Sequence, residues 1–163
     1  MIPEKTNRII RLAVKSFYFR IYLIWNIPMV FLSGIRIKKL DDEQCVVSVP
    51  FKWINKNPFQ STFWAVLGMA GEMSTGALIL QYTYKHKPSF STLLLKCKAD
   101  FNKKAVGITS FVCNDGKMIK DKLKEAMETK KPVVIKASTQ GIDERSNLIC
   151  QFNFTWSVKV RDF

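Results

Sequence analysis

The chain has few of the residues that build the commonest catalytic and metal sites. It contains a single histidine, His86, so neither a Ser-His-Asp triad nor the carboxylate–histidine pair of a hydratase is expected. It has no G-x-S-x-G segment, no Walker motif and no dinucleotide-binding glycine pattern. Its cysteines are far apart and form no C-x-x-C pair, which argues against a zinc site. We therefore expect no metal and no cofactor, and a cytoplasmic protein with four free thiols buried in strands: Cys45, Cys97, Cys113 and Cys150.

Acidic side chains are scarce as well. The 163 residues include 13 Asp and Glu against 26 Lys and Arg, a formal net charge of +13. Such an excess favours a polyanionic partner: a nucleic acid, an acidic membrane surface or a phosphorylated small molecule such as coenzyme A. The lysines are spread along the chain without a run of five or more, so we do not expect a nucleic-acid partner.

No segment is expected to be a transmembrane helix or a signal peptide. The apolar stretch 17–35 contains Arg20, Asn26 and Pro28, and the stretch 61–80 contains Glu72, which would cost about 3 kcal/mol or more at the centre of a bilayer. Both stretches are therefore predicted to belong to a soluble fold. The N-terminal helix leaves open a peripheral contact with acidic lipid, through a basic face formed by Lys5, Arg8, Arg11 and Lys15.

Hydrophobic periodicity predicts three helices and six strands. Helices are expected at 4–25, 60–82 and about 115–127, and strands at 34–40, 45–51, 93–101, 105–113, 132–139 and 147–161. The last strand has an apolar residue at every second position, and alternation in 93–101 places Leu93, Leu95 and Cys97 on a dry face opposite Lys96 and Lys98. Short connections join the strands in three consecutive pairs, so the sheet should be mostly antiparallel.

The helix at 60–82 is apolar nearly all round and must be enclosed. Gly68, Gly71 and Gly76 each weaken it by up to about 1 kcal/mol relative to alanine, which suggests that the sheet, a partner subunit or a ligand approaches its backbone closely. Six strands curling round one such helix form the α+β hotdog fold. We expect a single domain over 1–163, with a helical extension at 1–33 and the hotdog core at 34–163.

One segment resembles a known family. Asn57-Pro58-Phe59-Gln60, then Glu72 fifteen residues after Asn57, then Gly76 four residues later, is similar to hotdog acyl-CoA thioesterases of the phenylacetyl-CoA type. The chain resembles most a thioesterase-like bacterial family of unassigned function. The resemblance implies an acyl-CoA substrate, a homodimer or dimer of dimers, catalytic roles for Glu72 and Asn57, and substrate contacts from a further set: Phe59, Gln60, Ser61, Gly68 and Gly76.

The sequence departs from the family pattern at two places. Gln60 stands where the family has a glycine, and Phe63-Trp64-Ala65 stands where it has His-Gly-Gly. Those glycines supply a backbone amide to the thioester oxygen, and in this chain that amide would have to come from the start of the central helix. The departure motivates an alternative function, a non-catalytic binding protein for acyl-CoA or fatty-acyl groups.

Elementary chemistry favours the same residues. Thioester hydrolysis needs a base or nucleophile at the carbonyl carbon and donors at its oxygen. Glu72, in an apolar wall, should have a raised pKa, and the first free N–H groups of the helix form an oxyanion site.

Each residue also has a structural explanation. Glu72 can be a buried carboxylate bonded to Ser74, Thr75 or a lysine, Asn57-Pro58 a simple turn, Gly68 and Gly71 packing glycines, and His86 a solvated loop residue.

Overall fold

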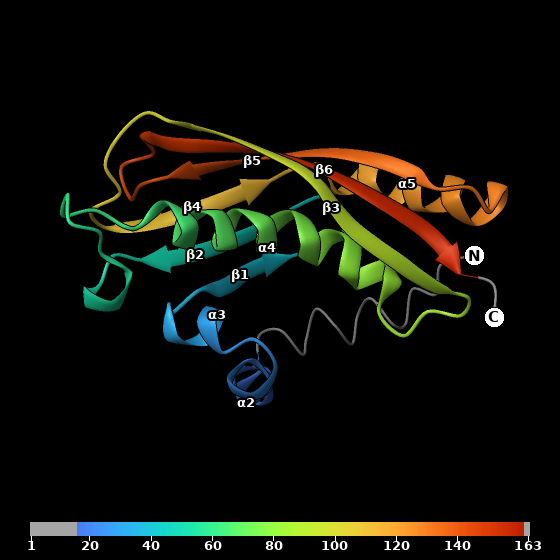
Figure 1. Ribbon diagram of the computed structural model, residues 1–163, viewed down its shortest axis with the longest axis horizontal. Helices are drawn as coiled ribbons and strands as arrows, with labels where there is room; N and C mark the ends of the chain where they lie inside the picture. Colours follow the sequence, from blue (N-terminus) through green and yellow to red (C-terminus); the bar gives the residue numbers. More distant parts are fainter. Residues whose placement is uncertain (1–15, 162–163) are drawn as a thin grey trace.

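The computed structural model describes residues 16–161 and shows one antiparallel sheet curling over a long central helix (Figure 1). The helices are α2 (Phe17–Asn26), α3 (Pro28–Leu32), the short 3-10 helix η1 (Trp53–Asn55), α4 (Trp64–Thr83) and α5 (Gly116–Thr129). The strands are β1 (Arg36–Leu40), β2 (Cys45–Pro50), β3 (Ser89–Phe101), β4 (Ile108–Cys113), β5 (Val133–Ile142) and β6 (Leu148–Arg161). The predicted α+β architecture, six strands wrapped on one helix, is confirmed.

The order of the strands in the sheet is β1-β2-β4-β5-β6-β3, and all neighbours are antiparallel. The predicted hairpins β1–β2 and β5–β6 are both present. The predicted pairing of β3 with β4 is wrong, because β3 pairs along its length with β6. The short connection does not form a hairpin turn: the N–H groups of Asn102 and Lys103 both donate to the carbonyl of Ile149, which holds it beside β6.

Helix α4 packs on the concave face of the sheet, against β2, β4, β5 and β6. Its buried side chains include Leu67, Ala70 and Leu78, which form one core with Phe111 and Phe152. The helix starts at Trp64 and not at residue 60, because the preceding residues form a separate turn. Within one chain the helix is not enclosed all round: Trp64 is 61% and Leu80 51% exposed, on the side that the sheet does not cover.

Strand β3 forms one edge of the sheet, and its pattern of burial differs from the prediction. Leu93 and Leu95 are 63% and 53% exposed, whereas Leu94 is partly buried against the core. A register shift between Leu94 and Lys96 explains the difference, since a bulge changes which residues face inward. Cys97 is likewise exposed, which contradicts the predicted buried thiol, while the other three cysteines are buried and free as expected.

Helix α5 is amphipathic and buries Ile119, Leu123 and Ala126. Asp115 precedes it, but its side chain makes no capping bond and accepts instead from the Ser138 N–H at 2.7 Å. His86 is 9% exposed, and its ring contacts the Phe90 ring edge-on. The prediction that His86 is solvated is therefore wrong.

Helices α2 and α3 project from the sheet below β1 (Figure 1). Pro28 ends the helical run as predicted and begins α3. The basic face predicted at Lys5, Arg8, Arg11 and Lys15 lies outside the described residues. Within residues 16–161, no helix is long and apolar enough to cross a membrane.

Candidate active site

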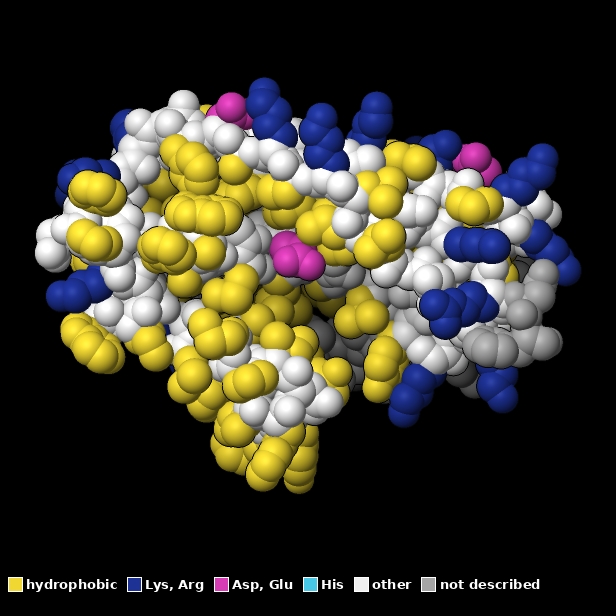
Figure 2. Space-filling model, in the orientation of Figure 1, with side chains coloured by type: hydrophobic (Ala, Val, Ile, Leu, Met, Phe, Trp, Pro, Cys, Tyr) yellow, Lys and Arg dark blue, Asp and Glu magenta, His cyan; other side chains and the backbone are white. Residues whose placement is uncertain are grey.

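Glu72 lies in the middle of α4, on the side that the sheet leaves open. It is the single acidic residue of the helix and belongs to a row spaced by four residues, which places its members on one side: Trp64, Gly68, Glu72, Gly76 and Leu80. In Figure 2 the hydrophobic side chains gather over α4 on this face. The Glu72 carboxylate therefore faces solvent from an apolar surface.

The Glu72 side chain is exposed, not buried in the wall that the sequence predicted. Partial burial nevertheless raises the pKa of its carboxyl above the ordinary value. Within residues 16–161 its carboxylate has no hydrogen-bond or ion-pair partner. The described residues therefore do not hold Glu72 as a structural carboxylate bonded to its neighbours.

The two hydroxyls expected to hold that carboxylate are engaged elsewhere. Ser74 Oγ donates to the Gly71 carbonyl at 2.7 Å and lies 2.9 Å from Thr139 Oγ1. Thr75 Oγ1 donates to the backbone carbonyl of Glu72 at 3.1 Å and accepts from the indole of Trp156 at 3.2 Å. Both hydroxyls connect α4 to the sheet and leave the Glu72 carboxylate free to react.

Two of the three helix glycines border Glu72 on the open side. A Cβ built on Gly68 would meet only the ring of Phe152, at 3.7 Å, and one on Gly76 only the ring of Trp156, at 3.8 Å, both ordinary contacts. Packing within one molecule therefore requires neither glycine. Gly71 is buried, and a Cβ there would lie 3.4 Å from Thr139 Cγ2 and 3.5 Å from the Phe111 ring, at the short end of ordinary contacts, so it packs against the sheet with little room to spare.

Asn57 organises the turn that leads into α4. Its side-chain oxygen accepts from the N–H groups of Phe59 and Ser61, at 2.9 and 3.2 Å, and its amide donates to Ser61 Oγ at 3.2 Å. This is the turn that the Asn-Pro sequence indicates. The amide keeps a second N–H, and the side chain is only half buried, so a substrate contact from the same group is geometrically open.

Within this turn, Gln60 has a φ of 59°, in the left-handed region that favours glycine. The backbone here thus has a conformation that glycine adopts without strain, although the residue is Gln60. Phe59 is 72% exposed, and Ser61 is buried beneath the turn.

The start of α4 offers free donors. The N–H of Phe63 donates to Asn55, and those of Val66 and Leu67 donate to Phe63, whereas the N–H groups of Trp64 and Ala65 donate to no other group in the described part of the chain. Two adjacent free N–H groups at a helix start attract a negative oxygen. The rise of the helix puts these two N–H groups about 10–12 Å along the axis from the backbone of Glu72, too far for one carbonyl group to contact both them and the Glu72 carboxylate.

A cleft of about 570 Å³ opens between α2–α3, β1 and α4. Its apolar lining includes Leu23, Ile35 and Met73, the residue next to Glu72, and four cations line it as well: Arg20, Arg36, Lys38 and Lys52. None of the four forms an ion pair with an acidic side chain of residues 16–161. Figure 2 shows the surface hollowed between α4 and α2.

The sequence predicted free N–H groups at the helix start but not that they belong to Trp64 and Ala65, and it did not predict the lining of this cleft. The cleft residues are too far apart in sequence to form a motif. One signal was present: residues 17–40 contain no Asp or Glu, so the cations that fold together there have no local acid.

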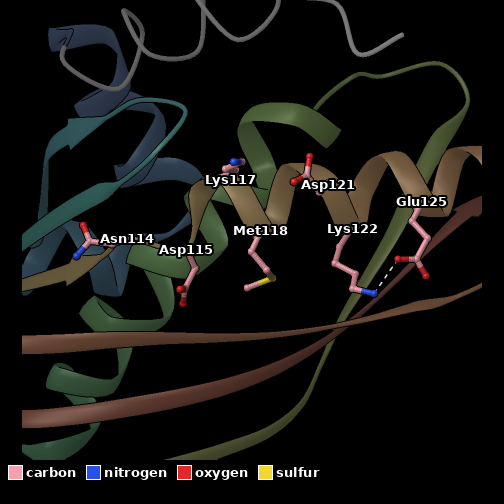
Figure 3. A pocket seen from close by; sticks show the side chains of 7 residues that line it. All are labelled: Asn114, Asp115, Lys117, Met118, Asp121, Lys122 and Glu125. Carbon is pink, nitrogen blue, oxygen red and sulfur yellow. Dashed lines mark hydrogen bonds and ion pairs between the residues drawn. The ribbon is translucent and has the colours of Figure 1, made fainter.

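A second hollow, of about 480 Å³, lies along α5 (Figure 3). Met118, Lys122 and Glu125 point into it toward the strands, and Lys122 pairs with Glu125 at 2.7 Å. Three acids and two lysines line it, so it offers little attraction to an anionic ligand, and it is a weaker candidate. No group of three His, Cys, Asp or Glu side chains suited to a metal occurs in residues 16–161.

Comparisons with known proteins identify the fold. No protein-family model and no curated protein matches the sequence. The chain is similar in structure to a protein of unknown function from Pseudomonas aeruginosa, a probable thioesterase, with 20% identity, a TM-score of 0.75, and coverage of 90% of this chain and 97% of that one. It is similar to a protein of unknown function from Chlorobaculum tepidum, with 13% identity, a TM-score of 0.73, and 98% of each chain covered.

A thioesterase from Staphylococcus aureus matches with 16% identity and a TM-score of 0.60, over 81% of this chain and 98% of that one. Two structures of that protein each carry an alanine substitution. In one the alanine replaces a glutamine, and in the other it replaces a glutamate fifteen positions later in the chain. At these identities the likeness shows the fold alone: the chain has the hotdog fold, which solved thioesterases share.

Proposed function

We propose that this protein hydrolyses acyl-CoA thioesters, with the carboxylate of Glu72 as general base or nucleophile. The observation that carries the proposal is the free carboxylate of Glu72, presented on an open apolar face between two glycines that packing within one molecule does not require. Its raised pKa makes it a stronger base than an ordinary glutamate.

Two reaction routes fit a single carboxylate. As general base, Glu72 takes a proton from water while the water oxygen bonds to the carbonyl carbon; the C–S bond then breaks and the CoA thiolate is protonated. As nucleophile, a carboxylate oxygen forms an anhydride and expels the thiolate, and water then hydrolyses the anhydride. In both routes the carbonyl oxygen becomes negative and needs donors.

The donors proposed are the N–H groups of Trp64 and Ala65. Because they lie about 10–12 Å along the helix from the backbone of Glu72, one thioester does not contact both these N–H groups and the Glu72 carboxylate of the same molecule. We therefore propose that two copies form the site, with Glu72 from one and the helix start, Asn57 and Gln60 from the other. The open side of α4 and the outer edge of β3, which has no partner strand in residues 16–161, are the surfaces that we propose for such a homodimer.

Two further observations support the assignment. Asn57 and Glu72 are fifteen residues apart, the separation of the glutamine and glutamate that were replaced in the Staphylococcus aureus thioesterase. The cleft beside Met73 has a volume within the range of ligand pockets, about 300–1,000 Å³, and an apolar floor suited to an acyl chain.

The test is thiol release from acyl-CoAs of increasing chain length. Glu72→Gln keeps the shape of the side chain and removes the base, and we expect kcat/KM to fall by about 10²–10⁴-fold. Glu128→Gln, at an exposed acid on α5, is the matched control and should stay within about twofold of wild type. Full activity in Glu72→Gln would exclude the proposed base.

The alternative, a non-catalytic acyl-CoA or fatty-acyl binding protein, is motivated by Phe63 and Trp64, bulky residues at the helix start. It predicts that acyl-CoA binds in a calorimetric titration and that no chain length is hydrolysed. Turnover that depends on Glu72 would eliminate this alternative.

A further inference from the structure

Helices α2 and α3 expose an unusual amount of apolar surface. The buried side of the pair packs on the core through Leu23, which is 4% exposed, and Val30. The exposed surface of the pair is also apolar, and its large side chains are between 38% and 81% exposed: Phe17, Tyr18, Ile21, Tyr22, Ile24, Trp25, Ile27, Met29 and Leu32, the last at the edge of the cleft. We call this set the α2–α3 surface. In Figure 2 it forms a protruding lobe of hydrophobic side chains.

The composition of this surface is that of a segment lying in a lipid interface. Tyr18, Tyr22 and Trp25 combine an apolar ring with a polar group, which suits the boundary between headgroups and acyl chains. No acidic residue occurs between positions 17 and 40, while Arg20, Arg36 and Lys38 lie in the same part of the fold. A convex apolar lobe with cations beside it and no acids complements an anionic membrane.

Charge argues against a second copy as the occupant. Two copies meeting through this surface would bring their Arg20, Arg36 and Lys38 side chains together without an acid from the same segment to neutralise them. Anionic headgroups would neutralise the same cations. We propose that the α2–α3 surface docks the protein on the surface of membranes that contain acidic lipid, with the Trp25 and Tyr18 side chains inserted at the interface.

Docking has a consequence that rests on the proposed hydrolysis. The inner side of α2–α3 lines the cleft that also contains Met73, next to Glu72. The docked protein would thus hold this cleft close to the lipid phase, where long-chain acyl-CoAs partition. Membrane binding itself does not depend on catalysis, so it is measured separately.

The test is co-sedimentation of the full-length protein with vesicles of phosphatidylcholine alone or of phosphatidylcholine mixed with phosphatidylglycerol. We expect binding to the acidic vesicles, with a partition coefficient at least about tenfold higher than for the neutral ones. The double variant Tyr18→Ser, Trp25→Ser should lose at least about tenfold in binding to the acidic vesicles.

Trp53→Ser is the matched control, because Trp53 is 80% exposed and Trp25 81%, but Trp53 lies on η1 outside the α2–α3 surface. Its binding should equal that of wild type, and the thermal melts of all variants should coincide. The proposal would be overturned if the wild-type protein did not bind acidic vesicles, or if the double variant bound them as well as the wild type does. A loss of self-association in the double variant without any change in vesicle binding would identify a contact between copies and overturn it equally.

Discussion

At the scale of single residues, the account depends on the protonation of Glu72. Its pKa is raised by burial, so the carboxylate, the form that acts as base or nucleophile, is lost as pH falls through a value above the ordinary 4.5. We predict that kcat/KM declines on the acid side with a midpoint above that value. A profile flat down to the ordinary glutamate range would contradict a catalytic carboxylate in this environment.

The same shift predicts an effect on stability. A carboxyl whose pKa is raised on folding stabilises the fold below its unfolded pKa, and this contribution is lost as pH rises through the folded pKa. Glu72→Gln should therefore have a higher Tm than wild type at neutral pH, and the difference should shrink in acid. Thermal melts at neutral and at acid pH measure this difference in Tm, and Glu128→Gln should show no such dependence on pH.

Gln60 provides a test of the turn before α4. Its φ of 59° is strained for a side chain with a Cβ and natural for glycine. We expect Gln60→Gly to leave the free energy of unfolding unchanged or raise it slightly. Gln60→Val, a β-branched residue, should lower it by about 1–2 kcal/mol. Denaturant titrations of the pair decide this, and equal stability of the two variants would contradict the assigned backbone conformation.

At the scale of elements, the open side of α4 allows a substitution that changes the candidate site without disturbing the packing of the core. Gly76→Ala adds a methyl group that meets only ordinary contacts and should raise helix stability by up to about 1 kcal/mol. Because Gly76 lies one turn from Glu72 on the same side of α4, we expect lower kcat/KM or weaker self-association. Activity assays and sedimentation measure both effects.

The control for this prediction is Gly71→Ala, which makes the same change in helix propensity on the buried side. We expect it to leave catalysis unchanged. If both variants kept full activity and assembly, the open side of α4 would have no role in the site.

Much of the fold could be predicted because alternation and helical periodicity report burial directly. The β5–β6 hairpin, the amphipathic α5 and the long α4 all follow from such patterns. The strand that pairs with β3 could not be predicted, because a short connection permits a hairpin without requiring one. The inward-facing side chains of β3 could not be predicted either, because the bulge at Leu94–Lys96 changes which of them face inward.

The sequence identified candidate residues for the site but not their geometry. Glu72 was identifiable as a lone acid in an apolar helix, but its exposure was not, since a sequence does not tell which side of α4 the sheet covers. The free amides of Trp64 and Ala65 depend on where the helix begins, which periodicity places only approximately.

At the scale of the whole molecule, the net charge of +13 should act on both proposed ligands. Coenzyme A and acidic lipid are anionic, and attraction between exposed charges weakens with added salt. We predict that KM for acyl-CoA rises and vesicle binding falls as ionic strength increases, whereas Tm changes little. Salt titrations of the three quantities test this, and a KM independent of salt would exclude a charge-driven encounter.

The central claim is that Glu72 of one copy acts on a thioester held at the α4 start of another. Trp64→Pro removes one free N–H at the first helical position, where proline is tolerated and the extended Phe63 suits it, while Trp64→Ala keeps that N–H. We expect Trp64→Pro to lose about 10²–10³-fold in kcat/KM, and Trp64→Ala to lose far less.

The most direct measurement is thiol release after Glu72→Gln and Trp64→Pro proteins, each nearly inactive, are unfolded together and refolded as a mixture. In mixed dimers one site receives both defects and the other receives neither, so roughly a quarter of wild-type activity should return. If the mixture stays as inactive as its parts while wild type treated in the same way recovers, the two residues do not meet across a dimer and the account is wrong.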